Sequence, residues 1–163
     1  MAITFNADEI FEMAEQIERN AAEFYREAAK KTSDAAAQRM FLNLAAMEDS
    51  HLRTFREMRQ QLGAGEKEQL TYDPDNQAML YLRVIADGHG TEGRKSETEK
   101  LTGKETITEL FEIAVNAEKN SVVFYTGLKV LVSTEAGRGK IDAIIKEELG
   151  HLAILKLQLA KLS

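Results

Sequence analysis

A glutamate and a histidine one helical turn apart, Glu48 and His51, interrupt what would otherwise be an uncharged helix seam. The apolar residues around them recur at alternating spacings of three and four, the pattern of the inward face of a bundle helix: Phe41, Leu44, Phe55 and Met58. Burying a carboxylate and an imidazole this close together is costly unless a further group pairs with them. In a bundle core the usual partner of a Glu-x-x-His pair is a metal ion, so the pattern predicts a metal site with more ligands elsewhere in the chain.

An internal repeat indicates where those ligands are. Shifting the numbering by one hundred superimposes, without a gap, Phe11, Glu12, Ala14, Glu18, Asn20, Phe24, Tyr25, Glu48, His51 and Leu52 on Phe111, Glu112, Ala114, Glu118, Asn120, Phe124, Tyr125, Glu148, His151 and Leu152. Each half therefore carries a glutamate followed, thirty residues later, by Glu-x-x-His. Two such motifs in matching registers are far rarer by chance than one. The sequence predicts one site built from Glu18, Glu48, His51, Glu118, Glu148 and His151.

Capping patterns place these residues on four long helices. Asn6 with Glu9 and Thr106 with Glu109 form capping boxes that open the first and third helices, and Ser33 is expected to cap the second. The predicted helices span about 7–31, 34–62, 106–131 and 135–161. The first two form one hairpin, at about 7–62, and the last two form another, at about 106–162.

The hairpins explain why the ligands should meet. Residue 33 is the midpoint of Glu18 and Glu48, and residue 133 is the midpoint of Glu118 and Glu148. Because an antiparallel hairpin brings together residues equidistant from its turn, each pair of carboxylates should lie at one height. The repeat then relates the two hairpins by an approximate twofold axis through the site.

The connection between the hairpins, at about 63–105, is much longer than the 2–8 residues that usually join neighbouring antiparallel helices. We therefore expect a crossover along the length of the bundle, so that the third helix starts at the far end. Residues Asp75 to Asp87 read as a short helix within it, and His89, between two glycines, reads as an exposed loop residue.

Composition sets limits on function. The 163 residues, 44% of them apolar, fit a single all-α domain with a sizeable core. The net charge of −6, with no basic stripe, argues against a nucleic-acid partner. No stretch approaches the roughly 20 apolar residues that a membrane span needs, and the default expectation is a soluble cytoplasmic protein. With no cysteine, the chain cannot build a disulfide, an iron–sulfur cluster or a rubredoxin-type iron centre.

Charge balance favours a metal over an empty bundle. Four facing carboxylates would repel one another, whereas two divalent cations would neutralise them and use both imidazoles. Without metal, all four glutamates should have a pKa raised above about 4.3 by burial and mutual repulsion. The competing interpretation of any single seam glutamate is a boundary residue that reaches solvent, and a metal-free structural bundle stays the third interpretation of the whole chain.

Tyr25 and Tyr125 lie two turns after Glu18 and Glu118 on the same seams. Two interpretations stay open for them. Each is either a packed aromatic whose hydroxyl finds some acceptor, or the donor of a hydrogen bond that orients a ligand carboxylate on a facing helix.

The pattern resembles the ferritin-like di-iron family and, within it, the rubrerythrin-like proteins. The matching elements are the two Glu-x6-Tyr stretches, the two Glu-x-x-His pairs on four helices and the long crossover. The resemblance implies a ferritin-like four-helix bundle holding two iron ions, for which zinc or manganese can substitute. It also implies that Glu18 and Glu118 are terminal ligands, that Glu48 and Glu148 bridge, and that one histidine, His51 or His151, binds each metal.

The resemblance further implies an oxidoreductase that reacts with hydrogen peroxide or dioxygen. Two departures bear on this. Peroxide-reducing rubrerythrins carry an extra glutamate one turn after the third-helix ligand, where this chain has Ser121, and they carry a cysteine-bound iron domain that this chain lacks. Turnover would therefore need a separate electron donor. Glu147 could offer a spare carboxylate, although its adjacency to Glu148 points it about 100° away.

The alternative function is an iron-binding or iron-buffering protein without turnover. A homodimer is a candidate assembly for either function.

Overall fold

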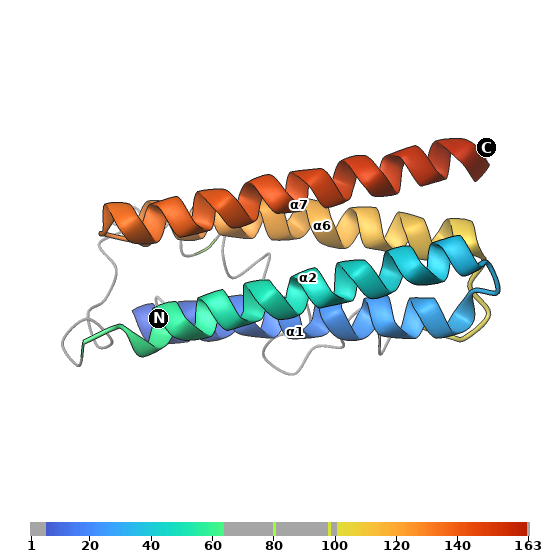
Figure 1. Ribbon diagram of the computed structural model, residues 1–163. Helices are drawn as coiled ribbons and strands as arrows, with labels where there is room; N and C mark the ends of the chain where they lie inside the picture. Colours follow the sequence, from blue (N-terminus) through green and yellow to red (C-terminus); the bar gives the residue numbers. More distant parts are fainter. Residues whose placement is uncertain (1–5, 64–79, 81–97, 99–100, 163) are drawn as a thin grey trace.

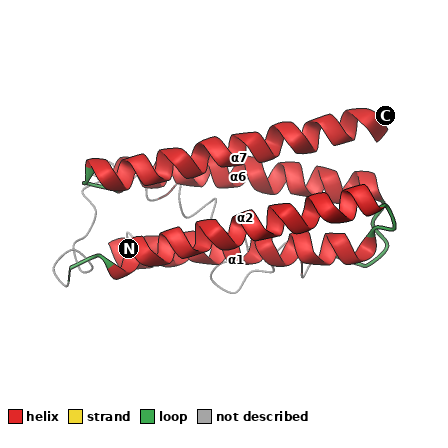
Figure 2. Cartoon of the chain, in the orientation of Figure 1, coloured by secondary structure: helices red, strands yellow, loops and turns green. Residues whose placement is uncertain are grey.

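The computed structural model describes residues 6–63, 80, 98 and 101–162, and the long elements within these residues are all helices. They are α1 (Ala7–Lys31), α2 (Ala35–Gln60), α6 (Ile107–Leu131) and α7 (Glu135–Leu162) (Figure 1). The described residues contain no strand, so the all-α prediction is confirmed (Figure 2). Within the short helix predicted at Asp75–Asp87 the structure describes only Leu80, which is helical, and His89 lies outside the described residues.

The four helices form two antiparallel hairpins, α1 with α2 and α6 with α7, that pack side by side (Figure 1). Phe111 in the second turn of α6 contacts Phe41 near the start of α2, with ring centroids 5.0 Å apart. The start of α6 therefore lies beside the α1–α2 turn, at the opposite end of the bundle from the end of α2. This is the far-end start that the length of the connection predicts.

The helix starts follow from their caps. Asn6 Oδ1 accepts from the Glu9 N–H at 2.9 Å while Glu9 Oε2 accepts from the Asn6 N–H at 2.8 Å, and Thr106 and Glu109 form the same reciprocal pair. Both predicted capping boxes are thus confirmed. The prediction for α2 is wrong by one residue, because Asp34 rather than Ser33 is the N-cap: its carboxylate accepts from the Ala37 N–H at 3.1 Å.

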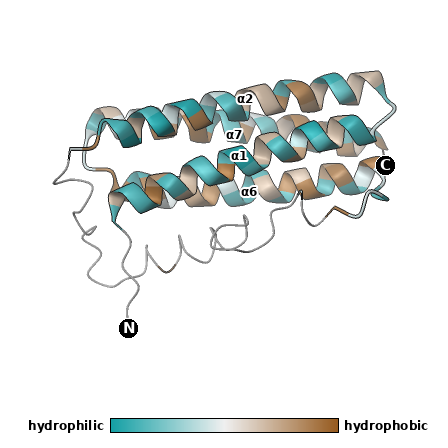
Figure 3. Cartoon of the chain, turned by 90° about the horizontal axis from the view of Figure 1, so that it is seen from below, coloured by the Kyte–Doolittle hydropathy of each residue, from teal (hydrophilic) through white to brown (hydrophobic). Residues whose placement is uncertain are grey.

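Two apolar clusters fill the bundle, one toward each end. The first cluster gathers around Phe11, Phe55, Phe124 and Ile141, and the second gathers around Phe24, Phe41, Phe111 and Leu155. Figure 3 shows brown hydrophobic turns alternating with teal hydrophilic ones along the helices, as expected when each helix buries one face. None of the described helices has an apolar stretch long enough to cross a membrane.

Candidate metal centre

The six predicted ligand residues lie together in one polar layer. They come from all four helices: Glu18 from α1, Glu48 and His51 from α2, Glu118 from α6, and Glu148 and His151 from α7. None is more than 3% exposed. Each apolar cluster includes one of the tyrosines that follow the terminal glutamates, so the layer lies between two dry regions. A group of carboxylates and imidazoles removed from water in this way needs internal charge compensation.

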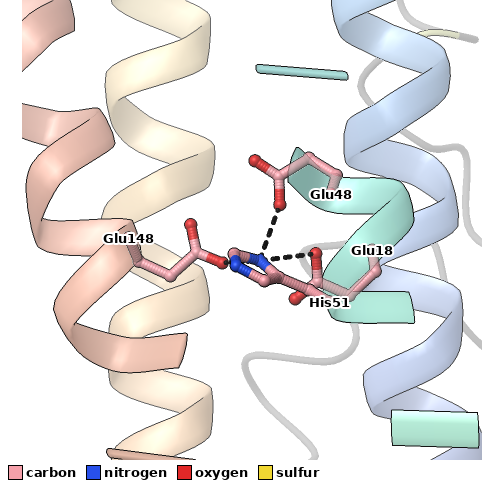
Figure 4. A group of neighbouring side chains, drawn as sticks. All are labelled: Glu18, Glu48, His51 and Glu148. Carbon is pink, nitrogen blue, oxygen red and sulfur yellow. Dashed lines mark hydrogen bonds and ion pairs between the residues drawn. The ribbon is translucent and has the colours of Figure 1, made fainter. Parts of the chain in front are cut away.

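Half of the layer surrounds His51. Its Nδ1 lies 3.0 Å from Glu148 Oε1, 3.2 Å from Glu48 Oε2 and 3.6 Å from Glu18 Oε2. Figure 4 shows the imidazole between Glu18 and Glu48 of its own hairpin and Glu148 of the other. One ligand atom from each of these four residues falls within 4.8 Å of the others, which is compact enough to hold a single metal ion.

The other half surrounds His151 in the same way. Its Nδ1 lies 3.1 Å from Glu148 Oε2, 3.2 Å from Glu48 Oε1 and 3.5 Å from Glu118 Oε1. These residues form a second compact group with the same 4.8 Å limit. The site therefore offers two adjacent positions for metal ions.

Glu48 and Glu148 belong to both groups. Each of them presents one carboxylate oxygen toward His51 and the other toward His151. Glu18 and Glu118 each belong to one group only. This is the division between shared and unshared carboxylates that a two-metal site requires.

The tyrosines connect the two hairpins. Tyr25 on α1 donates a hydrogen bond to Glu118 Oε1 on α6, and Tyr125 on α6 donates to Glu18 Oε1 on α1, the latter at 2.5 Å. Both rings are fully buried. Each hydroxyl thereby fixes the carboxylate of the facing helix and not that of its own. The geometry matches the orienting interpretation of these residues.

Burial raises the pKa of both unshared glutamates. For Glu118 the desolvated carboxyl, the charge of Glu148 and a hydrogen bond with Glu148 raise the pKa to about 8. The pKa of Glu18 is raised well above its ordinary value, first by burial and then by the charges of Glu48 and Glu148. In the absence of metal both shifts favour the protonated form of these two side chains.

The pKa of each shared glutamate, Glu48 and Glu148, is lowered. This corrects the expectation that the pKa of all four glutamates would be raised. Burial acts to raise the pKa of Glu48 and Glu148, but their close contacts with both histidines, and with Glu18 or Glu118, outweigh it and lower the pKa. Burial likewise opposes the charged imidazoles, yet their carboxylate neighbours raise the pKa of His51 and His151. In the metal-free layer these shifts favour protonated imidazoles beside the shared carboxylates, so the two kinds of group offset each other's charge.

The residues present fit a metal site by a further observation. Glu48 Oε1 is buried and makes no hydrogen bond to any described residue, although it lies 3.2 Å from His151 Nδ1. An orphaned carboxylate oxygen in a dry core is costly unless something else binds it. Carboxylate and imidazole together form a donor set suited to iron, zinc or manganese.

Glu147 is the residue whose contact the sequence left undecided. It is about half exposed, and its Oε2 lies 2.8 Å from His51 Nε2, the ring nitrogen that faces away from the carboxylates. Glu147 thus contacts a predicted ligand of the other hairpin, although it lies on a different face of α7 from Glu148. The sequence indicated a spare carboxylate at Glu147, but its contact with His51 depends on how the two hairpins pack.

A small pocket between α1 and α6 reaches the site. Its walls include the unshared Glu118 with Tyr25, and the small residues Ala21, Ala117 and Ser121 leave the space open. The volume available to the centre of a water-sized molecule is about 20 Å³, which suffices for one small molecule. Ser121 donates its hydroxyl to the Ala117 carbonyl at 3.2 Å, and Glu118 is the one residue of a charged type among the described residues that line the pocket.

Comparison with known proteins gives two matches. The sequence profile of a family described as a ferritin-like domain matches residues 6–161. The structure is similar to that of a Thermotoga maritima protein provisionally described as a ferritin-like diiron-carboxylate protein, with a TM-score of 0.74 and 23% identity over 98% of each chain. At that identity the likeness establishes the shared fold. No protein of curated function matches the sequence.

Proposed function

Because the chain belongs to the ferritin-like domain family, we propose that its buried polar layer holds two iron ions and reacts with hydrogen peroxide or dioxygen. The observation that carries the proposal is the pair of shared glutamates, each of which directs one oxygen toward each histidine. A carboxylate with both oxygens engaged in different directions is suited to bridge two cations. The similar Thermotoga maritima protein is described as a ferritin-like diiron-carboxylate protein, which supports the choice of iron.

The ligand assignment follows the two compact groups. One ion would be held by Glu18 and His51, the other by Glu118 and His151, and both by Glu48 and Glu148. When bound as ferrous iron, this pair would supply the two electrons that, with two protons, reduce one hydrogen peroxide to two molecules of water. Zinc or manganese could occupy the same ligands without this redox chemistry.

The side chains around the site hold and place protons. The raised pKa of Glu18 and Glu118 favours their protonated forms in the metal-free protein, and each carboxyl must lose its proton to bind a cation. The hydroxyls of Tyr25 and Tyr125 keep these two carboxylates oriented while that charge changes. The apolar clusters at both ends exclude bulk water, which leaves the pocket beside Ser121 as the route we propose for a small oxidant.

A second candidate function is iron binding or buffering without turnover. It is favoured by Ser121, where peroxide-reducing rubrerythrins have a glutamate, and by the lack of cysteine for a built-in electron-transfer iron. Repeated turnover would require a separate donor protein or reductant. That donor, the substrate and a homodimeric state stay predictions.

The deciding experiment loads the protein with ferrous iron under anaerobic conditions and mixes it with peroxide. We expect two ions per chain and oxidation within seconds, seen as near-ultraviolet absorbance, followed by further cycles when a reductant is supplied. Glu148→Ala should lose one ion and the fast reaction, whereas Glu112→Ala, at an exposed position on α6, should keep both. Binding of two ions with one slow oxidation would favour the buffering function. Binding well below one ion per chain would refute both.

A further inference from the structure

The two histidines of the site differ at the nitrogen that points away from the carboxylates. His51 Nε2 lies 2.8 Å from Glu147 Oε2. His151 Nε2 is buried, and none of the described residues forms a hydrogen bond with it. The inward Nδ1 atoms, in contrast, have equivalent surroundings, each within 3.6 Å of three carboxylates. The surroundings of the two inward Nδ1 atoms are thus equivalent, whereas those of the two outward Nε2 atoms differ.

The internal repeat explains the asymmetry. The residue that precedes Glu148 is Glu147, whereas the corresponding residue in the first half, before Glu48, is Met47. Glu147 reaches across from α7 to the histidine of α2. Met47 holds the matching position on α2, where a thioether is only a weak hydrogen-bond acceptor. The difference between Met47 and Glu147 at this position of the repeat therefore removes the acceptor from one histidine only.

This difference bears directly on metal binding. A neutral imidazole that coordinates a cation through Nδ1 carries its proton on Nε2 and must donate it to something. At His51 the Nε2–H can donate to the Glu147 carboxylate. This hydrogen bond fixes the tautomer and the ring orientation and increases the basicity of Nδ1. At His151 the same N–H would be buried without an acceptor among the described residues, which disfavours the tautomer that binding requires.

We infer that the two metal positions are unequal, and that Glu147 is a positioning residue that makes the His51 position the tighter one and the first to fill. This inference rests on the proposed two-metal function. It goes further in assigning a role to Glu147 and an order to loading. Loss of an outer hydrogen-bond partner of a ligating histidine typically lowers metal affinity about 10- to 100-fold, which sets the expected size of the effect.

The test is a titration with cobalt(II) alone, followed by its visible absorption, on the wild-type protein and on variants that exchange the two residues. In wild type we expect two binding steps. Glu147→Met should weaken the first step about 10- to 100-fold and leave the other nearly unchanged, whereas Met47→Glu should tighten the weaker step. The double exchange, Met47→Glu with Glu147→Met, should restore two steps of unequal affinity. Glu147→Gln, whose amide oxygen still accepts from Nε2–H, should keep most of the wild-type affinity.

Histidine variants assign the steps to positions. His151→Ala should retain the tighter step and His51→Ala should retain the weaker one. Both exchanged positions are partly exposed, at 37% for Met47 and 51% for the Glu147 side chain, and circular dichroism should confirm that the variants keep their helices.

Three results would overturn the inference: an unchanged isotherm in Glu147→Met, an equal change in both steps, or a Glu147→Gln protein as weak as Glu147→Met. A failure of all variants and wild type to bind cobalt would instead refute the two-metal function itself.

Discussion

Replacing Glu118 by glutamine isolates the cost of a buried ionisable group at the site. Glutamine has nearly the same shape and keeps an oxygen that can accept from Tyr25. It differs in that it cannot ionise. In the metal-free protein, the pKa of Glu118 is raised from 4.5 to about 8, chiefly by burial and by the charge of Glu148.

The sign and size of the effect follow from that shift. A group whose pKa is higher in the folded state contributes stability that is fully present below the unfolded pKa and is lost as pH rises toward the folded pKa. Between pH 5 and pH 7 the folded protein keeps the proton on Glu118 while the unfolded chain has mostly lost it. At about 1.36 kcal/mol per pH unit, wild type should therefore lose roughly 2–3 kcal/mol relative to Glu118→Gln over this range.

Urea unfolding with a chelator present measures this difference. The two proteins should be similarly stable at pH 5, and Glu118→Gln should be more stable at pH 7. Glu112→Gln, which changes an exposed carboxylate of the same helix, controls for the substitution itself. If the stability difference between wild type and Glu118→Gln were the same at both pH values, Glu118 would not be a protonated buried acid, and the description of the metal-free layer would be wrong.

Three further predictions address the site. Tyr25→Phe removes the hydroxyl that donates to Glu118, so the affinity for the ion at the His151 position should fall about tenfold in a cobalt titration; no loss would mean that the hydroxyl does not orient the carboxylate. Ser121→Glu should slow the oxidation of the iron-loaded protein by peroxide, measured by stopped-flow absorbance, because the larger side chain fills the pocket proposed as the route to Glu118; an unchanged or faster rate would contradict this. Because Glu18, Glu118 and both histidines have a raised pKa, binding of two divalent ions at pH 7 should release up to four protons, and the affinity should rise with pH. Calorimetry in buffers of different ionisation enthalpy counts these protons, and a release near zero would show that the four groups are not protonated.

The sequence by itself determined the helices and the meeting of the six polar residues. Capping boxes at Asn6 and Thr106 depend on residues three apart, and seam positions depend on the 3.6-residue period, so both can be read locally. The convergence of Glu18 with Glu48 follows from their equal distance from a turn, and the hundred-residue repeat extends the same argument to the second hairpin. The error at the start of α2 shows the limit of local rules, since Ser33 and Asp34 are both good caps and only the backbone of the turn selects Asp34.

The tertiary structure decided which side chains of the two hairpins contact each other. Which carboxylate each tyrosine contacts depends on the rotation of α1 against α6, and the contact proved to cross between hairpins. The pairing of Glu147 with His51 depends in the same way on the rotation of α7 against α2.

The opposite pKa shifts of the shared and unshared glutamates depend on the packing too. Close contacts with the two histidines outweigh burial at Glu48 and Glu148 and lower their pKa, whereas burial prevails at Glu18 and Glu118 and raises theirs. Periodicity fixes which residues face inward. The sign of each electrostatic shift depends on distances between side chains on different helices, and those are set only when the hairpins pack.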